Sequence, residues 1–101
     1  MNLIFRHEAS EDFWLAVEHY ESEEAGIGVR FRDEVQRFIG KIKNDPYQAR
    51  VRRALGFEYR RVNLNSFPYY IAYIIERDRI FVVAVSHGHK MPEHWMSRLE
   101  S

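Results

Sequence analysis

The chain has 101 residues, 46% of them hydrophobic and 15% aromatic, which suffices for one compact domain with a core and is too short for two. Its 15 Lys/Arg and 15 Asp/Glu residues give a formal net charge of zero, so no overall attraction to nucleic acid is expected. The absence of cysteine excludes disulfides, thiolate metal ligands and a cysteine nucleophile. No apolar run approaches a membrane span and no signal peptide is apparent, so we expect a single cytoplasmic domain over residues 1–101.

The first half of the chain predicts one strand followed by a helical hairpin. Residues 2–5 are short and apolar, as in a first strand. Apolar residues then recur every three or four positions over residues 9–20, which indicates an amphipathic helix. Two glycines within residues 23–28 permit a reversal, and a second periodic run follows over residues 27–42. Asn44-Asp45-Pro46 ends that helix, because proline disfavours the helical conformation of the residue before it.

The second half predicts strands. Residues 57–64 and 67–75 are rich in aromatic and β-branched residues and are separated by a turn. Residues 80–85 are apolar at every position, as in a strand that is buried on both faces. Pro92 fits the first turn of a short C-terminal helix that continues to Arg98. We therefore expect an α+β fold in which the hairpin packs on an antiparallel sheet of three or four strands.

The neutral total hides a charge asymmetry. Residues 1–49 carry six Lys/Arg against ten Asp/Glu, a net charge of −4, and residues 50–101 carry nine against five, a net charge of +4. The basic residues are densest in residues 50–61, with five arginines and one glutamate. Such a run is either a solvated edge strand, where charge prevents aggregation, or a site for an anion or an acidic partner.

Three histidines, His87, His89 and His94, lie within residues 86–95. A metal site is one interpretation, but no carboxylate other than Glu93 is nearby, and we expect neither a metal nor a cofactor. One histidine could instead act as a general acid or base, with Arg60 or Arg61 stabilising an anionic transition state in metal-independent RNA cleavage. The simplest interpretation is a join between a strand and the last helix.

The order of these features resembles the RelE/ParE superfamily of bacterial toxins, whose members are often called plasmid stabilisation proteins. The resemblance rests on the helical hairpin ending in Asn-Asp-Pro, the arginine-bearing strand, Phe67-Pro68-Tyr69 with Tyr73, the apolar strand, and His87 followed by Pro92, Trp95 and Arg98. It implies a toxin of a type II toxin–antitoxin module, held inactive in an oligomer with an antitoxin whose C-terminal segment wraps around it.

The resemblance leaves two activities open. Members of the RelE-like branch cut mRNA on the ribosome, using basic residues on the sheet and a C-terminal tyrosine. Here Tyr70 and Trp95 stand at two of those positions, and an indole cannot exchange a proton. The ParE-like branch, which inhibits DNA gyrase without chemistry of its own, therefore fits better. The alternatives are a ribosome-dependent endonuclease that uses His87 or His89 with Arg60 and Arg61, and a non-toxic member that retains antitoxin binding.

The charge distribution and the family resemblance together indicate the candidate site residues. No residue is assigned as catalytic in the favoured interpretation, and Trp95 is expected to contribute mainly by packing onto the sheet. The residues expected to contact the target or the antitoxin are Arg50, Arg52, Arg53, Arg60, Arg61, His87, Lys90, Trp95 and Arg98.

Overall fold

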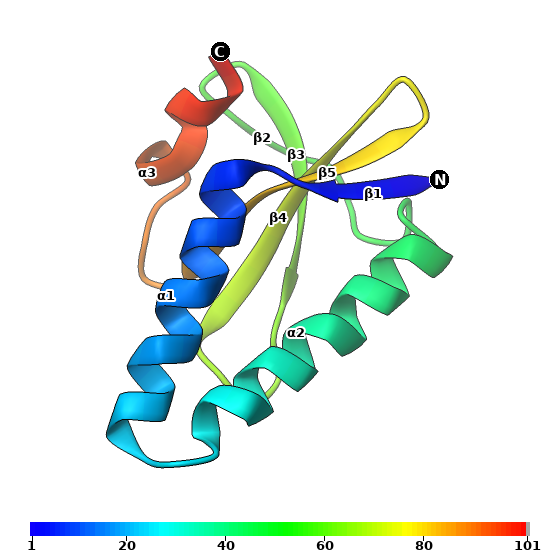
Figure 1. Ribbon diagram of the computed structural model, residues 1–101. Coiled ribbons are helices and arrows are strands. Elements are labelled where there is room, and N and C mark those ends of the chain that lie inside the picture. The colour runs from blue at the N-terminus through cyan, green and yellow to red at the C-terminus, as the bar shows by residue number, and fades with distance from the viewer. Residues whose placement is uncertain (101) are drawn as a thin grey trace.

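The computed structural model describes residues 1–100, which form one five-stranded sheet with helices on both of its faces (Figure 1). The elements in chain order are β1 (Asn2–Phe5), α1 (His7–Glu23), α2 (Ile27–Asn44), β2 (Arg52–Ala54), β3 (Phe57–Asn63), β4 (Tyr69–Glu76), β5 (Arg79–His87), α3 (Glu93–Met96) and the 3-10 helix η1 (Ser97–Glu100). The strand order across the sheet is β1-β5-β4-β3-β2. The predicted α+β class, helical hairpin and short C-terminal helix are confirmed.

The sheet differs from the expected antiparallel sheet at one edge. Strands β2 to β5 form an antiparallel meander, but β1 pairs in parallel with β5, from Asn2 opposite Arg79 to Phe5 opposite Val82. Tight turns make consecutive strands antiparallel, whereas most of the chain separates β1 from β5, so no turn fixes their relative direction. The additional strand β2 has three residues, too few to show a periodic pattern.

The connection between α1 and α2 depends on two glycines. Gly26 has φ +93°, a left-handed conformation that glycine adopts without strain. A Cβ atom on Gly28 would lie 2.6 Å from the carbonyl oxygen of Val17, so only glycine permits this approach of the helices. The Glu21 carboxylate accepts hydrogen bonds of 2.9 Å from the N–H groups of both glycines, which satisfies donors at the start of α2.

Helices α1 and α2 cover one face of the sheet and enclose the larger part of the core (Figure 1). Phe31 of α2 is fully buried, and its ring centroid lies 5.1 Å from those of Phe67 and Tyr69. Phe13 and Tyr20 of α1 contact the same phenyl ring. The aromatic side chains of the two helices therefore pack together where the hairpin meets the sheet.

Helix α3 covers part of the opposite face. The fully buried indole of Trp95 meets the ring of Tyr59 edge-on, with 5.1 Å between centroids. The predicted packing role of Trp95 is confirmed. The buried residues of this smaller cluster are Tyr59, Tyr70, Ala72, Val83, Ala84, Trp95 and Met96.

Two hairpin turns use two residues each with positive φ. Leu55 and Gly56 join β2 to β3 with φ of 50° and 83°, and Arg77 and Asp78 join β4 to β5 with φ of 51° and 61°. Turns of this kind match the right-handed twist of the strands, but they strain residues that carry a Cβ atom. The second turn therefore contains two strained residues.

Candidate partner-binding site

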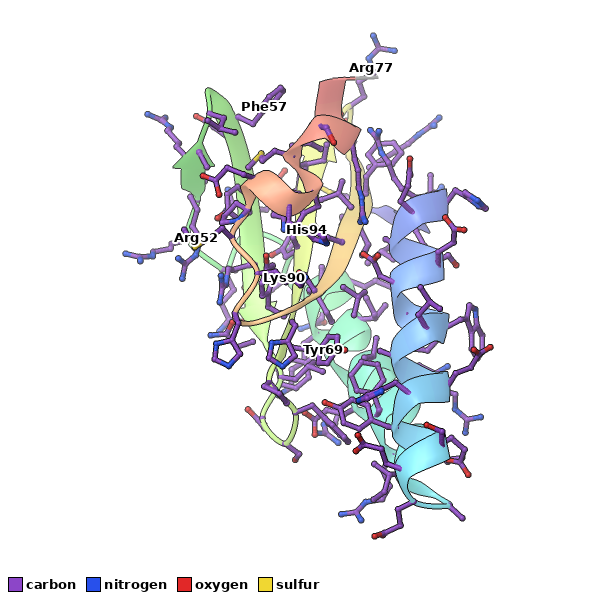
Figure 2. The ribbon with its side chains drawn as sticks, turned by 90° about the vertical axis from the view of Figure 1, so that its left-hand side faces the viewer. Arg52, Phe57, Tyr69, Arg77, Lys90 and His94 are labelled. Atoms are coloured by element: carbon purple, nitrogen blue, oxygen red, sulfur yellow. The ribbon has the colours of Figure 1, made fainter. Side chains whose placement is uncertain are left out.

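The arginines of β2 and β3 alternate between the two faces of the sheet, because successive side chains of a strand point in opposite directions. Arg52 lies opposite Tyr59, whose ring belongs to the α3 face. Arg53 lies opposite Glu58 on the other face and forms an ion pair with it at 2.6 Å. No ion pair involving Arg52 is found within residues 1–100, so its charge remains available to a partner. In Figure 2, Arg52 extends from the edge of the sheet distant from α1.

Arg60 is committed to the loop that follows α2. Its guanidinium donates hydrogen bonds to the carbonyl oxygens of Tyr47 and Ala49, and it lies 5.3 Å from the centroid of the Tyr47 ring. These contacts hold the loop against β3. Arg60 therefore stabilises the loop after α2, a structural role that the sequence did not indicate.

Arg61 points to the α3 face and stacks on an aromatic ring. Its guanidinium carbon lies 4.0 Å from the centroid of Tyr70 and its nitrogens donate to Asn63 Oδ1. The Tyr70 hydroxyl accepts a 2.7 Å hydrogen bond from Trp95 Nε1 and donates to the Lys90 carbonyl at 3.3 Å. Trp95 is buried beneath the α3 face and positions Tyr70 through this hydrogen bond. Arg61, stacked on the Tyr70 ring, is the charged side chain at the surface.

The histidine segment joins β5 to α3. The Nδ1 atom of His87 accepts a 3.2 Å hydrogen bond from the backbone N–H of His89, and the two rings stack with 4.8 Å between centroids. The His87 ring also contacts Tyr69, 5.3 Å away, on the face covered by α1 and α2. An acceptor role for Nδ1 places the proton of neutral His87 on Nε2. The join is therefore ordered by local contacts.

The structure does not bring together the four residues of the nuclease interpretation. His87 and Arg61 lie on opposite faces of the sheet. Arg60 shares the face of His87 but lies opposite Tyr73, four residues along β4 from Tyr69, or about 13 Å at the usual rise of a strand. In the described part of the chain, no three His, Cys, Asp or Glu side chains are grouped to hold a metal ion.

Asp12 and Arg98 form a bidentate ion pair that the sequence did not reveal. The two guanidinium nitrogens lie 2.7 and 3.1 Å from the Asp12 oxygens, and Arg98 also donates to the Val83 carbonyl at 3.0 Å. Asp12 in turn accepts the backbone N–H of Val85 at 3.1 Å. The hydrogen bonds that Arg98 donates to Asp12 raise the pKa of Arg98, although burial opposes this change. Arg98 therefore fastens the last helix to α1 and is not free to contact a partner.

Comparison with known proteins decides the family. Residues 3–92 match the family described as "ParE toxin of type II toxin-antitoxin system, parDE". The chain belongs to the ParE toxin family. A solved structure titled "Chromosomal ParDE TA system from P. aeruginosa" superimposes with a TM-score of 0.76 at 14% sequence identity, covering 86% of this chain and 95% of that chain. No curated protein matches the sequence.

The ParE match ends at residue 92, so α3, which carries Trp95, and η1, which carries Arg98, lie beyond the matched residues. The matched residues include the sheet and the helical hairpin, and the contacts of Trp95 and Arg98 attach the C-terminal segment to them. None of the helices within residues 1–100 is both long and apolar enough to span a bilayer.

Two cavities of this ParE family member differ in chemistry. One of about 390 Å³ lies where β3 diverges from β4, and its acidic side chains are already paired: Glu76 with Arg6 at 3.8 Å and Glu58 with Arg53. The second, of about 200 Å³, lies between α1, the end of β5 and the segment before α3. Its lining includes Lys90, which has no ion-pair partner among the described residues. The smaller cavity therefore has an unpaired positive charge, that of Lys90, available to bind an anionic group.

Proposed function

We propose that this chain is a toxin that inhibits DNA gyrase in the cytoplasm and is neutralised by a cognate antitoxin. The match to the ParE toxin family over residues 3–92 is the observation that supports this proposal most strongly. The dispersed positions of His87, Arg60 and Arg61 give no support to the endonuclease alternative. Inhibition by binding requires an exposed surface, and Arg61 on the Tyr70 ring provides a charged group of the kind enriched in binding hot spots.

The activity is tested by inducing the toxin without antitoxin. We expect filamentation and DNA-damage signalling while bulk translation continues, and inhibition of supercoiling by purified gyrase. Arg61→Gln should weaken that inhibition about tenfold, whereas Arg30→Gln on the exposed side of α2 should not. Prompt arrest of translation with mRNA cut in the ribosomal A site would establish the endonuclease function instead. Normal growth would indicate a non-toxic member.

The antitoxin proposed here carries an acidic segment that binds the α3 face and the β2 edge. Unpaired Arg52 and exposed Arg50 favour such a partner through complementary charge. Arg53 is the natural comparison, because Glu58 already neutralises it. Arg52→Glu should therefore weaken antitoxin binding in calorimetry more than Arg53→Glu does. Equal, unchanged affinities would mean that the arginine run is only a solvated edge.

A further inference from the structure

The outer edge of β5 is covered in two different ways along its length. β1 pairs with its first part as far as Val82, whose carbonyl accepts the N–H of Arg6 at 2.9 Å. Beyond that point, none of the strands within residues 1–100 pairs with this edge of β5. The Asp12–Arg98 pair takes the place of a strand, binding the carbonyl of Val83 and the N–H of Val85. Two side chains therefore substitute for one further residue of a neighbouring strand.

The next backbone groups along this edge have no hydrogen-bond partner among residues 1–100. Alternate residues of a strand direct their N–H and C=O groups to the same side, so the Val85 carbonyl and the His87 N–H face the edge that Asp12 occupies. The His87 carbonyl is used by the Lys90 N–H at 2.9 Å. Within residues 1–100, neither the Val85 carbonyl nor the His87 N–H receives such a contact. Val85 is only 2% exposed, and an unpaired buried carbonyl is unfavourable.

Val85 and His87 both line the 200 Å³ cavity, which we call the β5 notch. Side chains that line it include Asp12, Leu15, Tyr69, His87, Lys90 and His94. Figure 2 looks toward this region between α1 and the segment before α3, with Lys90 and His94 above Tyr69. Arg98 neutralises Asp12, so the ammonium group of Lys90 gives the notch a net positive character.

We propose that the β5 notch binds one acidic residue of an extended peptide segment running parallel to β5. The N–H of that residue donates to the Val85 carbonyl, and its carbonyl accepts from the His87 N–H, as one residue does between two neighbours in a parallel ladder. Its carboxylate pairs with the Lys90 ammonium. The segment continues the line of β1 in the same direction. Its natural source is the antitoxin, an assignment that rests on the proposed function.

The test uses the full-length, ¹⁵N-labelled protein and the capped peptide acetyl-Ser-Val-Glu-Val-Ser-amide. The largest amide shift on titration should occur at His87, which acquires a hydrogen-bond acceptor. Lys90→Gln should weaken binding about tenfold, and Lys43→Gln on exposed α2 should leave it unchanged. A peptide methylated on the glutamate nitrogen keeps its charge but cannot donate to Val85, and it should also bind about tenfold more weakly.

Three results would overturn the proposal. One is an unmoved His87 amide with shifts confined to the arginines of β2, another is equal binding of the methylated peptide, and the third is equal binding of a peptide with lysine in place of glutamate. None of these measurements involves gyrase. A toxin that fails to inhibit gyrase can still bind the peptide, and a toxin that ignores the peptide can still inhibit gyrase, so the two proposals fail separately.

Discussion

The two faces of the sheet are held by different interactions. Under α1 and α2, apolar and aromatic side chains such as Phe13 and Phe31 fill a continuous core. Under α3, a smaller cluster depends on single polar contacts, namely the Trp95 N–H to Tyr70 and the Arg98 pair with Asp12. Packing of the first kind tolerates exchange among apolar residues, whereas each polar contact of the second kind requires one particular partner. The packing of the α3 face therefore depends more on particular residues, and single substitutions disrupt it more easily.

The largest expected effect is at the centre of the α3 face. Trp95→Ala should lower the free energy of unfolding by about 3–5 kcal/mol, because it empties a fully buried site and leaves Tyr70 without its donor. Trp14→Ala is the matched control, since that side chain is 53% exposed, and it should change stability by less than about 0.5 kcal/mol. Urea denaturation measures both. A loss below 1 kcal/mol for Trp95→Ala would mean that α3 contributes little.

The ion pair should rank second. Asp12→Ala should cost about 2–3 kcal/mol, since the guanidinium of Arg98, with 18% of its side chain exposed, would lose its counter-ion. Asp12→Asn should cost less, because an amide oxygen can still accept the Val85 N–H. Thermal and urea unfolding of both variants would measure the difference. Equal losses would show that the charge, and not the hydrogen bond to β5, matters.

The face covered by α1 and α2 also contains polar contacts, among them those of the Glu34 carboxylate. Burial alone would raise the pKa of this carboxyl, but hydrogen bonds from Ser66 and the Asn65 N–H, together with the charge of Arg37, lower it below the ordinary 4.5. A lowered pKa stabilises the fold fully above pH 4.5, and the contribution is lost as the pH falls through the folded-state value. Unfolding measured across that range should show a smaller acid loss for Glu34→Gln than for the parent.

The smallest effect is a gain. Replacing Arg77 by Asn and Asp78 by Gly should stabilise the protein by about 1 kcal/mol, because both residues hold left-handed backbone conformations with φ of 51° and 61°. Both side chains are exposed, so thermal unfolding should report the gain without change in activity. Any loss of stability would mean that the native side chains make contacts that outweigh the strain.

The contrast between the faces also explains what sequence could predict. The helices and the main strands follow from apolar spacing, so residues 9–20, 27–42 and 80–85 were placed correctly. Asp12 and Arg98 are 86 positions apart in the sequence. Asp12 is one of several acidic residues on α1, and nothing in the sequence distinguishes it as the partner of Arg98. The parallel direction of β1 and the loop contacts of Arg60 likewise depend on tertiary geometry. Sequence therefore supplied candidate charges without indicating which were already paired.

The parallel pairing of β1 with β5 also sets the order in which the fold is completed during synthesis. α1 and α2 are adjacent in sequence and can pack together early. In contrast, β1 can pair only after residues 79–82 have been synthesised, and Asp12 can form its ion pair only after Arg98 has been synthesised. Contacts of long sequence separation form late, because closing long loops costs chain entropy. A nascent chain on the ribosome therefore lacks both a closed β5 edge and an attached α3 until residues 79–98 leave the exit tunnel. Translation itself therefore delays completion of the fold.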